Sequence, residues 1–208
     1  MPGAYVFPGG AVDAADRDQA ALERVVGPVR GIGFEFAVAA LRELFEEAGV
    51  LIVCRKDGRR AGIPDDTLRD LRRALAQGKH FISLLSEDEL YLDARELIYY
   101  SNWITPAGVP LRFDTHFFVA HPPEGQIAEA DAVELHDGIW LTPREALERA
   151  ARNELNVVFP TRKHLERMAK FETLAAFLEH ARERKVTACE PRVLEDGTLG
   201  FWPGDDAW

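Results

Sequence analysis

The sequence predicts an α/β fold in which a mixed sheet lies between helices, and three observations support this prediction. A helical pattern over residues 34–48 is followed at once by the apolar run 50–53, which is typical of a buried strand. Two segments rich in aromatic and branched residues, 97–104 and 112–120, flank a proline- and glycine-containing turn and predict an antiparallel pair. Helices and strands therefore alternate along the chain, as they do in mixed α/β domains.

The first elements are a short strand and a turn. Residues 4–7 have the composition of a strand end, and Pro8, Gly9 and Gly10 then form a turn where the backbone can pass close to another group. Residues 13–32 are polar and are predicted to be a loop with a helical turn near 19–25.

The middle of the chain predicts a helical insert over about 62–93. After the helix 34–48, the strand is expected to end at Cys54. Two helices should follow, at 65–77 and at 86–92, and Ser86 with Glu89 three residues later is the capping pattern that predicts the second start.

The last third predicts a strand, a helix and a long C-terminal helix. A strand is expected over 138–141, and the run 142–145, Thr-Pro-Arg-Glu, carries the cap, first-turn proline and returning glutamate of a helix start. One long helix is expected after Thr161, with an apolar stripe formed by Leu165, Met168, Phe171, Leu174, Leu178 and Ala181. This stripe favours core or dimer contact over a cofactor site.

Composition limits the partners of the protein. The chain has 208 residues, 47% of them hydrophobic, and a net charge of −10, which argues against a nucleic-acid backbone or an anionic membrane as the main partner. No apolar run reaches the roughly eighteen residues that span a bilayer, and no secretory signal opens the sequence, so we predict a cytoplasmic protein. Cys54 and Cys189 are too few for a disulfide framework and are expected to be free thiols.

The most informative residues are Arg42, Glu43, Glu46 and Glu47. Steps of three and four residues put the three carboxylates on one side of a helix, directed toward the same point. Such a cluster repels itself unless a cation is present, and Mg²⁺ or Mn²⁺ prefers oxygen ligands. An exposed acidic helix face is the alternative for three glutamates alone. Arg42, four residues before Glu46, can hold that carboxylate in place, and Gly49 supplies a helix stop.

Residues 42–50 fit the pattern Arg-Glu-hydrophobic-x-Glu-Glu-x-Gly-hydrophobic at every fixed position, and the chain thereby resembles the Nudix hydrolases. The resemblance implies a Nudix-type α/β/α sandwich over residues 1–185, followed by a tail over 186–208. It also implies a diphosphatase in which Glu43, Glu46 and Glu47 bind Mg²⁺ or Mn²⁺. Arg42 would orient these carboxylates, and the backbone of Gly9 and Gly10 would allow close approach of the substrate.

One carboxylate of the Nudix box cannot be assigned from the sequence. Gly10 lies much further from Arg42 than is usual in the family, which indicates an insertion over about 13–32. Counting forward from Gly10, the family's first glutamate falls on Asp16. Counting back from Arg42, it falls on Phe34, with Glu35 beside it.

This insertion, the run 7–16 and the run 112–115 resemble the peroxisomal coenzyme A diphosphatase branch of the family and its bacterial relatives. The branch implies coenzyme A or acyl-coenzyme A as the first substrate candidate, with ADP-ribose or a dinucleotide second. A Nudix-fold binding module without turnover is the competing class, favoured by the short start and the unassigned glutamate.

Several roles stay open. The general base is a box glutamate or a later loop residue such as Glu129 or Glu134, although solvated loop carboxylates are the simpler reading of both. His116 is expected to be packed or hydrogen-bonded rather than catalytic. The aromatic residues Trp103, Phe113 and Phe117 are either core or a stacking surface for a base.

The start of the chain and its oligomeric state are also open. Only six residues precede Phe7, so we predict either that Met1 is an internal start of a longer polypeptide or that the tail 186–208 supplies the missing sheet edge. A homodimer is the oligomer that we consider, with the aromatic tail residues Phe201, Trp202 and Trp208 as candidate contacts.

Overall fold

The computed structural model of the chain describes residues 3–128 and 138–201. It contains two compact units, and each is described by itself. The box unit comprises residues 8–98 and 120–139, and the helical unit comprises residues 1–7, 99–119 and 140–208. Both contain helices and strands, in agreement with the predicted α/β class.

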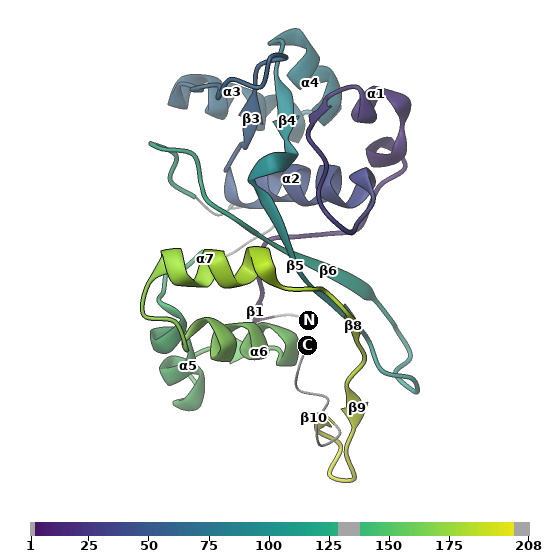
Figure 1. Cartoon of the computed structure of the whole chain (residues 1–208), viewed down its shortest axis with the longest axis vertical. Coiled ribbons are helices and arrows are strands. Elements are labelled where there is room, and N and C mark those ends of the chain that lie inside the picture. The colour runs from purple at the N-terminus through teal and green to yellow at the C-terminus, as the bar shows by residue number, and fades with distance from the viewer. Residues whose placement is uncertain (1–2, 129–137, 202–208) are drawn as a thin grey trace. The chain divides into compact units, whose positions relative to one another are not determined.

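The sheet of the box unit has three strands in the order β2-β4-β3 (Figure 1). The central strand pairs parallel with β2 and antiparallel with β3. The strands are β2 Val25–Val26, β3 Val53–Cys54 and β4 Tyr91–Asp93. The helices are η1 Ala15–Arg17, α1 Gln19–Leu22, α2 Phe34–Ala48, α3 Asp65–Ala76, α4 Phe81–Glu87 and η2 Ala94–Glu96.

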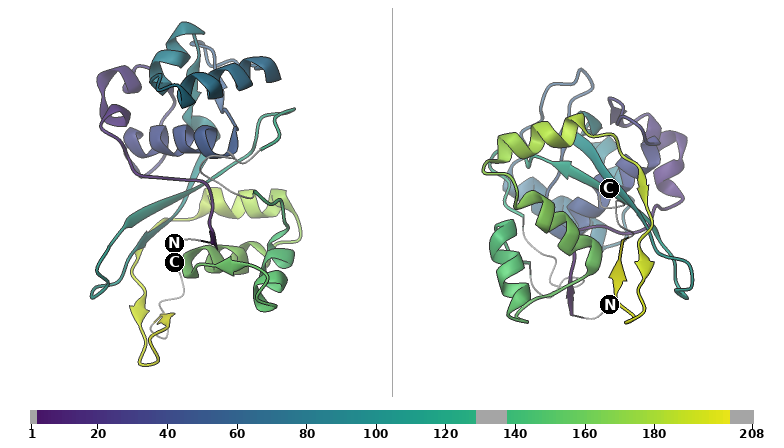
Figure 2. Two further views of the ribbon diagram at one scale, coloured as in Figure 1. Left: turned by 180° about the vertical axis from the view of Figure 1, so that it is seen from behind. Right: turned by 60° about the horizontal axis from the view of Figure 1, so that its bottom comes forward.

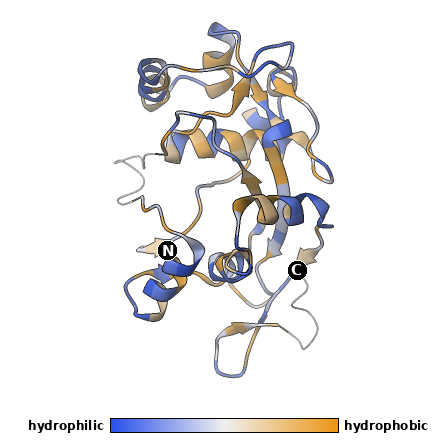
Figure 3. Cartoon of the chain, turned by 60° about the vertical axis from the view of Figure 1, so that its left-hand side comes forward, coloured by the Kyte–Doolittle hydropathy of each residue, from blue (hydrophilic) through white to orange (hydrophobic). Residues whose placement is uncertain are grey.

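Helix α2 runs over the predicted residues and supplies much of the core of this unit. Val38, Leu41 and Phe45 are each at most 1% exposed, and α2 is mainly orange, the hydrophobic colour, in Figure 3. The helix ends at Gly49, whose φ of 70° is left-handed and whose N–H donates to the carbonyl of Phe45 at 2.9 Å. Most of the circumference of α2 is therefore packed, which fixes the direction of its polar side.

The insert follows the prediction in its first helix and departs from it in its second. Helix α3 begins at Asp65, as expected, but α4 ends at Glu87, so the predicted helix over 86–92 is wrong. Ser86 is not a cap, because its hydroxyl donates to the carbonyl of Ile82 inside α4. The buried Leu92 belongs instead to strand β4, the central strand of the sheet.

The helical unit has a three-stranded sheet in the order β6-β5-β8. Strand β5, Leu97–Ile104, begins in the box unit and continues here beside β6, Asp114–Ala120, and Figures 1 and 2 show the two strands side by side. Strand β8, Ala188–Cys189, comes from the tail and pairs parallel with Asn102 and Trp103 of β5. The tail thus adds a strand to this sheet. A pairing of this kind is required if residues 186–208 supply a sheet edge.

Two smaller pairs complete the strands of this unit. Strand β1, Ala4–Tyr5, pairs parallel with β7, Asn156–Val157, so the predicted N-terminal strand is present. Strands β9, Arg192–Val193, and β10, Leu199–Gly200, form an antiparallel pair. Residues 138–141, which are described, do not form the predicted strand.

Three helices cover the rest of the helical unit: α5 Pro143–Ala151, α6 Phe159–Met168 and α7 Leu174–Glu183. Helix α5 has the predicted capping box of Thr142 and Glu145. The predicted single long C-terminal helix is wrong, because Thr173 ends the intervening turn and caps α7 by accepting from the N–H of Ala176. The predicted stripe is interrupted as a result, and Leu174 is 58% exposed.

Two hydrophobic clusters hold the helical unit together. One joins α5, β7 and α6, with Tyr5 and Phe7 packed against it. The other centres on Trp103 and Cys189, and Phe201 packs on Trp103 with ring centroids 5.7 Å apart. Phe201 therefore contacts its own chain, whereas Trp202 and Trp208, also considered as dimer contacts, lie outside the described residues.

Both cysteines are free, as predicted, and the structure shows that both are buried. Burial, followed by the charge of Asp93, raises the pKa of Cys54 to about 11, so its thiol stays protonated. Among the helices of residues 3–128 and 138–201, none is long and apolar enough to cross a membrane.

Candidate active site

Arg42 is the centre of the candidate site, and one side of its guanidinium is bound to the N-terminal segment. Nε and Nη2 donate to the two carboxylate oxygens of Asp16 at 3.0 and 2.9 Å, and Nη2 also donates to the carbonyl of Ala11 at 2.9 Å. Arg42 and Asp16 are only 8% and 2% exposed. This two-point contact fixes the plane of the guanidinium.

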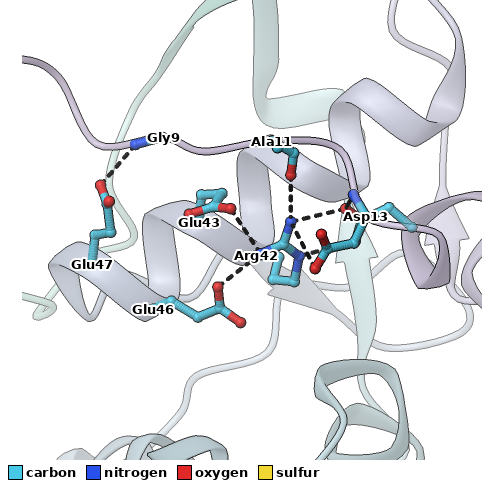
Figure 4. Close-up of polar contacts among 8 residues, drawn as sticks. Gly9, Ala11, Asp13, Arg42, Glu43, Glu46 and Glu47 are labelled. Atoms are coloured by element: carbon cyan, nitrogen blue, oxygen red, sulfur yellow. Dashed lines mark hydrogen bonds and ion pairs between the residues drawn. The ribbon is translucent and has the colours of Figure 1, made fainter. Parts of the chain in front are cut away.

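The other side of the guanidinium faces the predicted metal ligands. Nη1 donates to Glu43 Oε1 and to Glu46 Oε2, both at 2.8 Å (Figure 4). Two of the three box glutamates therefore meet at one nitrogen. The predicted contact between Arg42 and Glu46 is confirmed, and Glu43 shares it.

Glu47 is held by the glycine turn instead. The N–H of Gly9 donates to Glu47 Oε2 at 2.7 Å, as Figure 4 shows. A side chain on Gly10 would meet the carboxylate of Glu43, so only glycine leaves that carboxylate where it is. The two glycines that the sequence predicts at the substrate thus also line the carboxylates of α2.

The electrostatics of the cluster are uneven. Burial opposes the charge on Arg42, but the hydrogen bond and charge of Asp16, with the charges of Glu46 and Glu43, outweigh burial and raise the pKa of Arg42. Burial raises the pKa of Glu46, and repulsion from Glu43 and Asp13 adds to this rise against the attraction of Arg42. Repulsion among the carboxylates remains because they share a single cation, Arg42. An added cation would relieve this repulsion.

The structure resolves which acidic residue pairs with Arg42. Asp16 makes the pair, and it is held in turn by the N–H of Asp13, which donates to Asp16 Oδ2 at 2.8 Å. Glu35 lies in the first turn of α2, and no described contact joins it to Arg42. Asp16 is therefore the carboxylate that Arg42 binds, and it is also the residue on which the forward count from Gly10 falls.

The donor set fits a hard divalent cation in its chemistry. Glu43, Glu46 and Glu47 project from adjacent turns of α2 and offer carboxylate oxygens, the ligands that Mg²⁺ and Mn²⁺ favour. In the structure these oxygens accept from Arg42 and Gly9, and the described residues hold no group of three His, Cys, Asp or Glu side chains arranged as a metal site. An ionised carboxylate has two oxygens with about four acceptor positions, so these side chains can keep their donors and also bind a cation.

The other candidates lie in the helical unit or outside the described residues. The Nδ1 of His116 is 2.8 Å from the hydroxyl of Tyr99, so this histidine is hydrogen-bonded, as expected. Trp103 is 2% exposed and belongs to the core, whereas Phe113 is 58% exposed. Glu129 and Glu134, considered as general bases, fall in the segment 129–137 that the structure does not describe.

Comparison with known proteins identifies the family of the chain. The family model described as the NUDT19 Nudix domain matches residues 24–168. The chain is 29% identical to the acyl-coenzyme A diphosphatase NUDT19 of Homo sapiens and 27% identical to that of Gallus gallus. Each alignment covers all of this chain, and 68% and 69% of the respective relative.

A solved structure gives the same result for the fold. The crystal structure of a Nudix hydrolase from Alicyclobacillus acidocaldarius matches with a TM-score of 0.75 and 30% identity, over 86% of this chain and 81% of that one. This confirms the predicted Nudix-type fold. The chain therefore belongs to the NUDT19 Nudix domain family and is a Nudix hydrolase.

Proposed function

We propose that the protein hydrolyses a diphosphate linkage in a nucleoside diphosphate derivative, with coenzyme A or acyl-coenzyme A as its substrate. The observation that carries the proposal is the clamp of Arg42 on Asp16, Glu43 and Glu46, which brings three carboxylates together around one guanidinium. The choice of substrate rests on the relatives that are named acyl-coenzyme A diphosphatases.

The residues of the chain have separate tasks in this proposal. Arg42 aligns Glu43 and Glu46, and Asp16 prevents the guanidinium from turning. Gly9 orients Glu47, and the missing side chain of Gly10 leaves room beside Glu43. A divalent ion held by Glu43, Glu46 and Glu47 would neutralise charge on the phosphoryl oxygens and lower the pKa of a water that attacks phosphorus.

The experiment that tests the proposal is a substrate panel with Mg²⁺ or Mn²⁺. Coenzyme A, an acyl-coenzyme A, ADP-ribose and NADH are compared by product analysis, for the wild type and for Glu46→Gln. We expect the coenzyme A compounds to be hydrolysed best and the substitution to reduce turnover by about a thousandfold or more, because it removes a charged ligand. Chelation with EDTA should abolish the same activity.

Glu35→Gln is the matched control, because it neutralises a glutamate of the same helix that has no described contact with Arg42. Its turnover should stay within about twofold of the wild type. Faster hydrolysis of ADP-ribose or NADH would refute the choice of coenzyme A while keeping the site. Equal turnover of the wild type and Glu46→Gln would refute the site, and no turnover of any substrate would favour the binding-module alternative.

A further inference from the structure

A basic cavity lies in the box unit, apart from the carboxylates around Arg42. It has a volume of about 580 Å³, and five cations line it: Arg24, Arg55, Lys56, Arg59 and Arg60. Only two carboxylates, Asp57 and Glu89, line it with them. Such a surplus of positive charge is unexpected in a chain whose net charge is −10.

Two of these cations are held in place by groups that leave their charge uncompensated. The guanidinium of Arg24 lies over the ring of Tyr91, 4.8 Å from its centroid, and Arg55 donates to the carbonyl of Asp88 at 2.9 Å. Neither contact neutralises the charge, because an aromatic ring and a backbone carbonyl are uncharged. Lys56 has no carboxylate partner within the described part of the chain.

The other two cations serve as an internal contrast. Arg59 pairs with Asp57 at 2.6 Å, and Arg60 pairs with Glu96 at 3.1 Å. Two of the five cations are therefore paired with carboxylates, and the other three, Arg24, Arg55 and Lys56, are not paired in this way. Arg24 and Arg55 come from opposite ends of the sheet order β2-β4-β3.

A solvated charged loop is the simplest alternative, because five of the six residues of the turn 55–60 are charged. It does not account for Arg24, which is half-buried and comes from a different segment, 31 positions before Arg55. Planar guanidinium groups match phosphate oxygens in geometry, and a cavity of this size holds a ligand larger than one phosphate.

We propose that this cavity is a second ligand site, which binds the di- or triphosphate group of a small phosphorylated compound. Arg24 and Arg55 would grip the phosphate oxygens, and Lys56 would add a flexible third cation. No residue of the cavity belongs to the carboxylate cluster, so occupancy is independent of the divalent metal that the proposed reaction uses.

Calorimetric titration of the full chain with inorganic tripolyphosphate, in EDTA and at low ionic strength, tests the proposal. Chelation removes metal-dependent binding at the carboxylates, and low salt preserves the attraction of exposed charges. We expect one saturable site, and weaker binding of orthophosphate, because fewer oxygens reach the three cations. The absence of saturable binding would overturn the proposal, and so would equal affinity for orthophosphate.

Variants then locate the site. The double variant Arg24→Gln and Arg55→Gln should weaken tripolyphosphate binding at least about tenfold, because two charge-assisted contacts are lost. Lys56→Gln, whose side chain has no described contact to lose in the fold, should weaken it about threefold. Thermal unfolding checks that the double variant is folded. If it is not folded, the tripolyphosphate affinity of Lys56→Gln alone decides whether the cavity is the site.

Two controls complete the test. Arg69→Gln removes an exposed cation of α3 that pairs with Asp66 and does not line the cavity, and it should leave the affinity unchanged within about twofold. Glu46→Gln, in the carboxylate cluster, should also leave it unchanged. Loss of affinity in Arg69→Gln equal to that in the cavity variants would show nonspecific charge attraction and overturn the proposal. Undiminished tripolyphosphate binding in both Lys56→Gln and the double variant would also overturn the proposal.

Discussion

Arg42 in the box unit and His164 in the helical unit are both buried polar side chains, but they are stabilised in opposite ways. Arg42 keeps its charge, because Asp16, Glu43 and Glu46 surround it. His164 is 1% exposed and lies among aromatic rings, the nearest being Phe117 with centroids 4.3 Å apart, and burial lowers its pKa to about 4. One cluster is charged and can exchange donors, while the other is neutral and tightly packed.

The hydrogen bonds of His164 agree with a neutral ring. Its Nδ1 is 2.6 Å from the carbonyl of Pro160, which can only accept, so Nδ1 carries the proton. Its Nε2 is then free to accept from the hydroxyl of Ser101, 2.6 Å away. The polar groups of the His164 cluster therefore serve the packing of the helical unit.

The largest effect should come from breaking the Arg42 cluster at its buried partner. Asp16→Ala leaves a buried guanidinium without its two-point contact, so we expect the free energy of unfolding in urea to fall by about 3–5 kcal/mol. Glu35→Ala, in the first turn of α2 and without a described contact to Arg42, should change it by less than about 0.5 kcal/mol. Equal effects of the two substitutions would show that Asp16 does not stabilise Arg42.

Short-range patterns in the sequence predicted the box helix well. Helix α2 has the predicted bounds. Its signals lie within one helix: the spacing of Arg42, Glu43, Glu46 and Glu47, and the helix stop at Gly49. The partner Asp16 could not be chosen from the sequence, because the insertion made two counts possible. In the structure Arg42 binds Asp16, which lies 26 positions before it in the sequence.

Long-range packing explains where the prediction of the fold was wrong. The apolar residues around 86–92 fit a helix in sequence, but Leu92 pairs with Val25 and Val53 from distant segments and forms a strand. The buried cluster of His164 has no sequence signal, because its aromatic neighbours come from separate elements. The cytoplasmic location and the homodimer stay predictions.

The second prediction concerns the room beside Glu43. Gly10→Ala places a methyl group where the Glu43 carboxylate lies, and the carboxylate can move away because it is the end of a flexible side chain. We expect kcat/KM for the coenzyme A substrate to fall by about a hundredfold, with the free energy of unfolding changed by less than about 1 kcal/mol. A change in stability without loss of activity would show that Gly10 serves only the fold.

The third prediction uses the neutral ring of His164. Its pKa is about 4 in the folded state and 6.5 in a model peptide, so the unfolded state binds a proton more readily. The stability that it contributes is complete above pH 6.5 and is lost as the pH falls toward 4. We expect the free energy of unfolding to fall by about 2 kcal/mol between pH 7 and pH 5 from this residue.

The variant His164→Gln isolates that contribution, because glutamine does not titrate. Urea unfolding at both pH values should show a smaller pH dependence in the variant, by about the same 2 kcal/mol. A pH dependence equal to that of the wild type would assign the change to the surface carboxylates.

The smallest predicted effect concerns two helix caps in the helical unit. Each cap is a local interaction, unlike the packing around His164. Thr142 accepts from the N–H of Glu145 at 3.2 Å, and the Glu145 carboxylate accepts from the N–H of Thr142 at 3.1 Å. Thr173 accepts from the N–H of Ala176 at 3.2 Å, and no reciprocal bond is found among the described residues. We expect Thr142→Ala to lower the free energy of unfolding by about 1 kcal/mol and Thr173→Ala by about 0.5 kcal/mol. Chemical denaturation of the two variants measures the difference. If Thr173→Ala were the more destabilising, the break between α6 and α7 would depend on this cap more than on packing.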